Sequence, residues 1–140
     1  MDLITIGTLA KRAGMGAGTL RYYETLGLIA PVARTRGRYR LYRDGELRRL
    51  RFIRRGQELG FSLEEIAVLL GLNERRGARA ADVKQLTQEK LRDIDQRIRD
   101  LERMKRGLER LSERCHGEGP ASECPILAAL NGDDGRAEAL

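Results

Sequence analysis

The apolar residues at the start of the chain have the spacing of short amphipathic helices. Ile6, Leu9 and Ala13 fall on one face of a helix that Gly14 ends. A second helix is expected over residues 17–26, where another glycine follows the last apolar position. Two short helices joined by a glycine-containing turn predict a helix-turn-helix.

Two further helices are expected before residue 72. The first covers residues 44–59 and combines an apolar stripe with an arginine-rich opposite face. The second covers residues 63–70, where Ser62 and Glu65 have the spacing of a capping box. Gly71 is expected to end this helix.

Between the two helical pairs, the pattern changes to that of a small β-hairpin. Pro31 breaks the helix, Gly37 marks a tight turn, and apolar or aromatic positions alternate with basic ones. The alternating basic positions are Arg34, Arg36, Arg38 and Arg40. A two-stranded wing of this kind, with tyrosines between its arginines, suits contact with phosphates.

The second half of the chain is dominated by one long helix. Residues 72–79 have the composition of a linker, and residues 80–114 contain no proline and only Gly107 as glycine. A heptad seam of nearly five repeats is formed by Val83, Thr87, Leu91, Ile94, Ile98, Leu101, Lys105, Leu108, Ser112 and Cys115. A helix of this length spans about 50 Å. It cannot cover its own seam, so a second copy of the chain is the expected partner.

The net charge of +6 is concentrated in the first half of the chain. Residues 1–60 carry 13 basic and 5 acidic side chains, whereas residues 61–140 carry 14 and 16. This asymmetry predicts a polyanion-binding segment joined to a part with another role. The chain shows no apolar run of membrane-spanning length and no signal-peptide pattern at its start, so we expect a cytoplasmic protein without a membrane partner.

Both cysteines and the only histidine of the chain lie in one short segment. Cys115 and Cys124 are separated by eight mostly small or polar residues, and His116 adjoins the first cysteine. A structural disulfide, a metal site, a redox pair and two unrelated thiols are the alternatives. A reducing cytosol disfavours the stable disulfide, and no C-x-x-C motif supports a thiol-disulfide redox sensor or enzyme.

Taken together, these segments resemble the MerR family of bacterial transcription regulators, over about residues 4–130. The resemblance is carried by TLRYYETLGLI, GRYRLY, RFIRRGQELGFSLEEI and the long helix. It implies a mainly α fold: a winged helix-turn-helix DNA-binding domain over residues 1–71, a linker at 72–79, and a dimerisation helix at 80–114. It also implies an antiparallel coiled coil in a homodimer. The positions that match the family's DNA contacts are Thr19, Arg21, Tyr22, Arg38, Tyr39, Arg40 and Tyr42.

The resemblance extends to the metal-sensing branch of the family, with a C-x8-C loop and a short helix over residues 115–130. It implies metal binding by Cys115 and Cys124. Divalent-ion sensors usually add a cysteine from the dimerisation helix of the partner subunit, at the position where this chain has Ala80, whereas copper-sensing, CueR-like relatives have a small residue there. Two thiolates suit Cu(I), Ag(I) or Au(I), and Lys84 could offset the remaining negative charge. The alternative is a soft divalent ion: Hg(II), Zn(II), Cd(II) or Pb(II).

The resemblance further implies how such a protein acts. Metal binding would distort promoter DNA that is already bound, so that RNA polymerase engages it, and the protein would be an activator rather than an enzyme. No nucleotide-binding or hydrolytic motif points to catalysis. We expect residues 131–140 to form a disordered tail.

Overall fold

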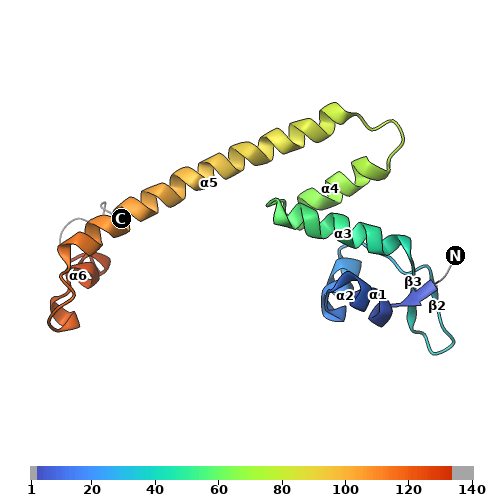
Figure 1. Ribbon diagram of the computed structural model, residues 1–140, viewed down its shortest axis with the longest axis horizontal. Coiled ribbons are helices and arrows are strands. Elements are labelled where there is room, and N and C mark those ends of the chain that lie inside the picture. Colours follow the sequence, from blue (N-terminus) through green and yellow to red (C-terminus); the bar gives the residue numbers. More distant parts are fainter. Residues whose placement is uncertain (1–2, 134–140) are drawn as a thin grey trace. The chain divides into compact units, whose positions relative to one another are not determined.

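The structure is a computed structural model that describes residues 3–133, and it divides into two compact units (Figure 1). The head comprises residues 3–86, and the terminal unit comprises residues 87–133. The division falls within the longest helix. The elements are β1 (Leu3–Thr5), α1 (Ile6–Ala13), α2 (Ala17–Thr25), β2 (Ala33–Arg34), β3 (Arg40–Arg43), α3 (Gly45–Glu58), α4 (Leu63–Glu74), α5 (Ala80–Arg114), the 3-10 helix η1 (Ala121–Glu123) and α6 (Pro125–Asn131).

Capping residues visible in the sequence fix several helix ends. The hydroxyl of Thr5 accepts a hydrogen bond from the Thr8 N–H at 3.2 Å, and Gly14 ends α1 in the left-handed conformation, with φ of 67°. At α4, the Ser62 hydroxyl accepts from the Glu65 N–H at 3.1 Å. The Glu65 carboxylate in turn accepts from the Ser62 N–H at 2.8 Å. The predicted capping box is therefore present.

The expected end of α4 at Gly71 was wrong, because the helix continues to Glu74. An internal glycine costs a helix about 1 kcal/mol relative to alanine. The extension past Gly71 brings Glu74 to Arg49 of α3, and their ion pair helps to offset this cost. The segment between α4 and α5 is correspondingly shorter than predicted, at residues 75–79.

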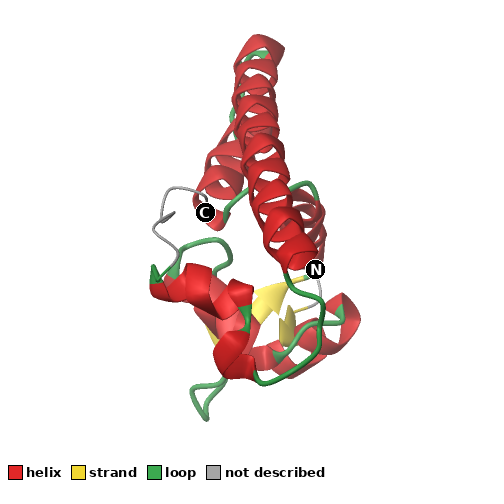
Figure 2. Cartoon of the chain, turned by 90° about the vertical axis from the view of Figure 1, so that its left-hand side faces the viewer, coloured by secondary structure: helices red, strands yellow, loops and turns green. Residues whose placement is uncertain are grey.

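The wing belongs to a three-stranded antiparallel sheet rather than to the predicted two-stranded hairpin (Figure 2). The strand order is β1-β3-β2, with Ile4 of β1 opposite Tyr42 of β3, and Arg34 of β2 opposite Arg40. The additional strand, β1, precedes α1 directly. It therefore ties the wing to the start of the helix-turn-helix.

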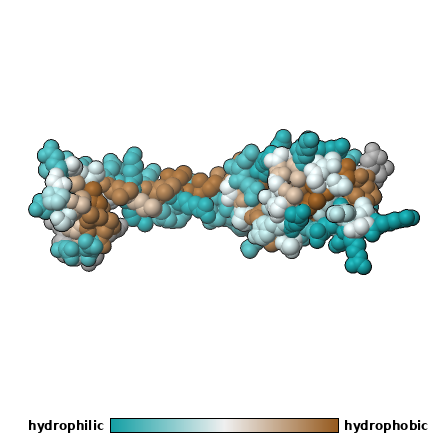
Figure 3. All heavy atoms as spheres, turned by 90° about the horizontal axis from the view of Figure 1, so that it is seen from below, coloured by the Kyte–Doolittle hydropathy of each residue, from teal (hydrophilic) through white to brown (hydrophobic). Residues whose placement is uncertain are grey.

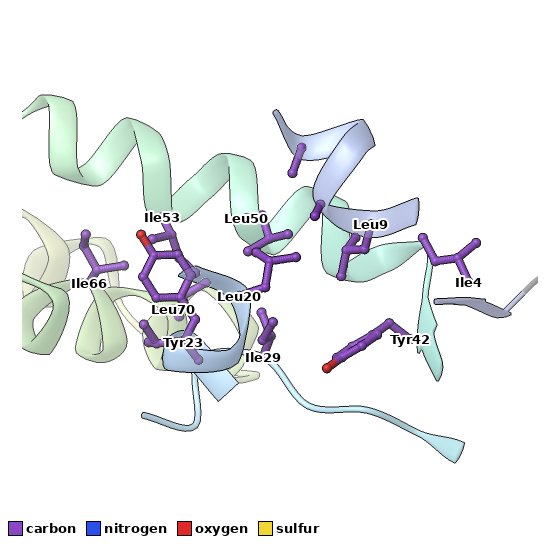
Figure 4. Packing of buried hydrophobic residues seen from close by; sticks show 13 residues of the cluster. Ile4, Leu9, Leu20, Tyr23, Ile29, Tyr42, Leu50, Ile53, Ile66 and Leu70 are labelled. Atoms are coloured by element: carbon purple, nitrogen blue, oxygen red, sulfur yellow. The ribbon is translucent and has the colours of Figure 1, made fainter. Parts of the chain in front are cut away.

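The core of the head lies between α1, α2, α3, α4 and the sheet (Figure 4). Its fully buried large side chains are Leu9, Leu20, Ile29, Tyr42, Leu50, Ile53 and Ile66. Close approach of α3 and α4 requires a glycine at position 56. A Cβ there would lie 2.9 Å from Ile66 Cγ1, a distance that real contacts do not reach.

The long helix α5 exposes much of its predicted apolar seam, and hydrophobic residues form a band along it in Figure 3. Leu91, Ile98, Leu101 and Leu108 are 54%, 47%, 61% and 64% exposed in the single chain. No helix among residues 3–133 is both long and apolar enough to cross a membrane.

The terminal unit buries few side chains of its own. Leu111 of α5 is 2% exposed and Ala129 of α6 is 3% exposed. Helix α6 ends at Asn131, and Gly132 caps it with a φ of 78°. The disordered tail expected over residues 131–140 was therefore wrong for Asn131 and Gly132, and residues 134–140 lie outside the described part of the chain.

Candidate DNA-binding surface and metal site

Helix α2 turns one face to the core and the other to solvent. Leu20 and Tyr23 are 0% and 5% exposed, and the Tyr23 hydroxyl donates to Gln57 of α3 at 3.2 Å. Consequently the predicted DNA contacts Thr19, Arg21 and Tyr22 are all exposed. They lie on the exposed surface of a helix whose opposite face is fixed in the core, as a helix that enters the major groove requires.

The tip of the wing is closed by hydrogen bonds that centre on Thr35. The Thr35 N–H donates to the Tyr39 carbonyl at 2.9 Å, and the Tyr39 N–H donates to the Thr35 hydroxyl at 3.1 Å. The left-handed residue of this turn is Arg38, with φ of 64°. A Cβ at Gly37 would lie 3.2 Å from the Tyr39 ring, a tight contact that the exposed ring would relieve by a small shift. Arg38 and Tyr39 are left exposed at the tip.

The two remaining predicted contacts, Arg40 and Tyr42, differ in exposure. The Arg40 side chain is 38% exposed, and its Nε lies 2.9 Å from Glu24 Oε2. Tyr42 is 0% exposed, and its hydroxyl donates to Glu24 Oε1 at 3.2 Å. A direct DNA contact by Tyr42 does not agree with this burial, because its ring packs in the core of the head (Figure 4). Tyr42 supports the wing from inside.

The two cysteines lie next to each other although eight residues separate them in the sequence. Cys115 Sγ and Cys124 Sγ are 3.7 Å apart, and both thiols are free and partly buried. Gly117 and Gly119 reverse the chain between them with φ of 75° and 83°, values that favour glycine. The 3-10 turn η1 then delivers Cys124 to the start of α6. The loop geometry thus brings the two predicted ligands together.

Backbone N–H groups at the start of α6 favour the thiolate form of Cys124. Hydrogen bonds from the N–H of Leu127, and secondarily from that of Ile126, lower the pKa of the Cys124 thiol, while partial burial opposes them. A contact with the Cys115 thiol lowers the pKa further. Thiolate is the form that binds soft metals.

Within residues 3–133, the chain supplies only these two sulfurs to one metal site. No group of three or more His, Cys, Asp or Glu side chains in that range is arranged to hold an ion. His116 is exposed, and Ala80, the first residue of α5, carries no ligating atom. Further ligands would have to come from solvent or from another molecule.

Sequence reasoning missed the network of Glu24, and it missed Arg49. The Arg49 Nε donates to the Leu28 carbonyl at 2.9 Å, just after α2, and the same side chain pairs with Glu74. These contacts join residues far apart in the chain, so no local spacing indicates them. The one sequence clue to Glu24 is its charge, because it is the only acidic residue between positions 17 and 43.

Comparison with known proteins gives consistent results along the chain. A family model described as MerR HTH family regulatory protein matches residues 4–72, and another, described as MerR, DNA binding, matches residues 47–111. The mercuric resistance operon regulatory protein of Bacillus cereus is 46% identical over 125 residues, covering 89% of this chain and 95% of that protein. The HTH-type transcriptional regulator HmrR of Sinorhizobium medicae is 38% identical over 135 residues, covering 96% and 91%.

A solved structure extends the likeness to three dimensions. The crystal structure of the transcription regulator PbrR691 from Ralstonia metallidurans, in complex with lead(II), has a TM-score of 0.81 and 34% sequence identity. The match covers 91% of this chain and 98% of that one.

A helix-turn-helix with a basic wing, followed by a long helix with an exposed apolar seam, defines a DNA-binding transcription regulator. The chain belongs to the MerR family of such regulators. It is a metal-responsive regulator and not an enzyme, and it binds promoter DNA as a dimer.

Proposed function

We propose that this regulator senses a soft divalent ion held between Cys115 and Cys124. The observation that carries the proposal is the 3.7 Å separation of two free sulfurs in a preformed loop. Relatives whose names specify mercury or lead support a thiophilic divalent ion.

The sulfur separation is compatible with a bent arrangement of the two ligands around one ion. With metal–sulfur bonds of about 2.3 Å, a tetrahedral angle places two sulfurs about 3.8 Å apart, whereas a linear one places them about 4.6 Å apart. The observed 3.7 Å fits the first value. Two thiolates also neutralise a divalent ion completely, so no further cation is needed in the loop.

A soft monovalent ion, Cu(I), Ag(I) or Au(I), is the second candidate. The observation in its favour is the ligand set, because two-coordinate ions need nothing beyond the two sulfurs, and Ala80 offers no third ligand. In that case the sulfurs would have to move apart, and Lys84 would offset the excess negative charge.

For DNA binding, we propose direct contacts by Thr19, Arg21 and Tyr22 from α2 and by wing residues Arg38, Tyr39 and Arg40. Their exposure on a strongly basic head supports this assignment. Replacing Arg21 with alanine should weaken operator binding by about 1–3 kcal/mol if it contacts a base edge. Replacing Arg40 with alanine should weaken binding to all sequences and reduce the salt slope by about 0.9. Unchanged affinity and salt slope in both variants would refute the assigned surface.

For dimerisation and activation, we propose that the α5 seams of two copies pair antiparallel. The exposed leucines of α5 support such pairing. In this scheme RNA polymerase is engaged indirectly, through promoter DNA that the metal-bound dimer distorts.

A reporter assay with separate metal salts tests the sensing proposal. We expect induction by one or more of Hg(II), Cd(II), Pb(II) and Zn(II), and weak or no induction by Cu and Ag salts. Cys115→Ser and Cys124→Ser should abolish induction and leave operator affinity within a few-fold of the original. Ser122→Ala, in the same loop, is the matched control and should respond normally.

The same assay distinguishes the two candidates. Induction by Cu and Ag with silence toward the divalent ions would replace the divalent proposal by the monovalent one. Ala80→Cys should strengthen the divalent response, since it adds a thiolate. Retained induction in both cysteine variants would show that the sensing site lies elsewhere.

A further inference from the structure

One acidic side chain stands inside the basic DNA-binding surface of the head. Between positions 17 and 43 the chain has six arginines, and Glu24 is the only acid. A carboxylate at this place repels DNA phosphates at a range of about 10 Å at ordinary salt concentrations. Its presence therefore lowers the affinity for any DNA, unless it improves the arrangement of other contacts.

The contacts of Glu24 join the two DNA-binding elements. Its side chain is 16% exposed and lies on α2, while both of its partners lie on β3. One carboxylate oxygen accepts from the Tyr42 hydroxyl at 3.2 Å, and the other lies 2.9 Å from Arg40 Nε. Each oxygen thus ties the wing to the recognition helix.

The tyrosine half of this arrangement is held from within the core. Tyr42 is fully buried, and burial together with the nearby Glu24 carboxylate raises the pKa of Tyr42 to about 12. The hydroxyl therefore stays protonated and keeps donating to Glu24 at any physiological pH. The carboxylate is thereby fixed before it meets Arg40.

The arginine half leaves donors available to DNA. Arg40 is ion-paired with Glu24 through Nε, which lies 2.9 Å from the carboxylate without making a hydrogen bond, and its terminal Nη groups lie outside this contact. A guanidinium can present its terminal N–H groups to a phosphate while Nε stays beside a carboxylate. The direction in which Arg40 reaches outward is then set by α2.

We propose that Glu24 is a positioning residue that makes operator recognition by this regulator more specific. It orients Arg40 relative to α2 and offsets its charge, so that Arg40 contributes fully only where α2 is seated in its own site. On unrelated DNA the paired Arg40 is a weaker phosphate ligand. The inference rests on the DNA-binding surface proposed above, and it concerns discrimination between sequences rather than affinity alone.

The test compares operator DNA with random duplex DNA over a range of salt concentrations. Glu24→Gln keeps the shape and removes the charge. We expect this variant to bind random DNA several-fold more tightly, with a salt slope steeper by about 0.9, because one more cation is free to meet a phosphate. The operator should gain no affinity, so the specificity ratio should fall by about fivefold or more.

Two further variants separate positioning from general effects. Tyr42→Phe removes only the hydroxyl that holds Glu24 and should lower the ratio by a smaller factor. Glu64→Gln removes one negative charge from an exposed position on α4 and, as the control, should leave the ratio unchanged.

A double-variant cycle shows whether Glu24 acts through Arg40. In an Arg40→Ala background, Glu24→Gln should have no further effect on the ratio. A ratio within twofold of the original in folded Glu24→Gln protein would overturn the inference, as would an equal effect in both backgrounds. If Arg21→Ala and Arg40→Ala themselves leave DNA binding unchanged, it is the proposed surface that fails.

Discussion

The head and the terminal unit differ in how they bury their apolar side chains. The head encloses a hydrophobic core within one chain, with Leu50, Ile53 and Ile66 fully buried. Among the described residues of the terminal unit, the buried hydrophobic side chains are Leu111 and Ala129, and much of the apolar seam of α5 is exposed. One unit is therefore stabilised by its own packing, whereas the proposed pairing of α5 with a second copy of the chain would cover the apolar seam of the other.

The same contrast applies to the two functional sites. Side chains of the proposed DNA-binding surface are held by contacts that exist without DNA, including the Tyr23–Gln57 hydrogen bond and the Glu24 bridge. The proposed metal site consists of two sulfurs in a loop, and among residues 3–133 no third His, Cys, Asp or Glu side chain joins them. A preformed surface suits constitutive DNA binding, and an incomplete site suits a response to an added ligand.

The largest effect is expected from a charge in the α5 seam. Leu101→Asp should dissociate the dimer at micromolar concentration, because an unpaired charge buried between helices costs several kcal/mol. Sedimentation equilibrium should give a monomer mass, and operator affinity should fall by more than about tenfold, since one head makes half of the contacts. Arg99→Asp, on the opposite face of α5, is the control and should remain dimeric. A dimer that persists in Leu101→Asp would mean that the α5 seam does not form the dimer interface.

A core substitution in the head should act without regard to dimerisation. Ile53 is 0% exposed, and its replacement by alanine should lower the free energy of unfolding by about 2–5 kcal/mol. Urea denaturation in the monomeric Leu101→Asp background measures the loss for the isolated chain. Leu59→Ala, at a position 67% exposed, should cost less than about 1 kcal/mol. Similar losses in the two variants would show that the head is not stabilised by the core described.

Loss of the α4 cap should have a smaller effect, again confined to the head. Ser62→Ala leaves the Glu65 N–H without its acceptor and should reduce the free energy of unfolding by about 1 kcal/mol. Ser122→Ala, in the terminal unit, provides the comparison and should leave urea denaturation of the head unchanged. If Ser122→Ala is as destabilising as Ser62→Ala, the two units do not unfold separately.

The smallest expected effect is on thiol reactivity in the terminal unit. Because backbone N–H groups lower the pKa of Cys124, its thiolate persists to lower pH than that of an ordinary cysteine. In Cys115→Ser protein, the rate of iodoacetamide labelling should reach half its maximum below the pH found for a small-molecule thiol. Protons compete with metal for the same sulfur, so metal affinity should decline as the pH falls through this range. If the pH midpoint of labelling is at or above that of the free thiol, the backbone N–H groups do not lower the pKa of Cys124.

The elements predicted correctly are those that local sequence determines. Caps such as Thr5, Gly14 and Ser62 act on residues three or four positions away, and the helix at 80–114 follows from heptad spacing. Strand β1 was missed because its three residues form a strand only by pairing with β3, about 38 positions later. Continuation of α4 past Gly71 likewise depends on a long-range contact, between Glu74 and Arg49.

In the candidate sites too, features set by local sequence were predicted and features set by long-range contacts were not. The resemblance to the metal-sensing branch implied that Cys115 and Cys124 share a loop, and alternation indicated the basic wing. Periodicity in a short strand cannot tell which tyrosine faces the core, so Tyr39 and Tyr42 were treated alike although they are 72% and 0% exposed. The role of Glu24 depends on contacts with β3 that only the folded head brings together.

The close contact of Gly56 with Ile66 determines the order in which these two positions can change during evolution. Any side chain at position 56 would meet Ile66 Cγ1 at 2.9 Å and force α3 and α4 apart. A lineage that replaces Gly56 first passes through a destabilised protein. A lineage that first replaces Ile66 by a smaller residue loses packing but creates the space that a Cβ needs. Substitutions at position 56 should therefore be inherited after substitutions at position 66, and not before them.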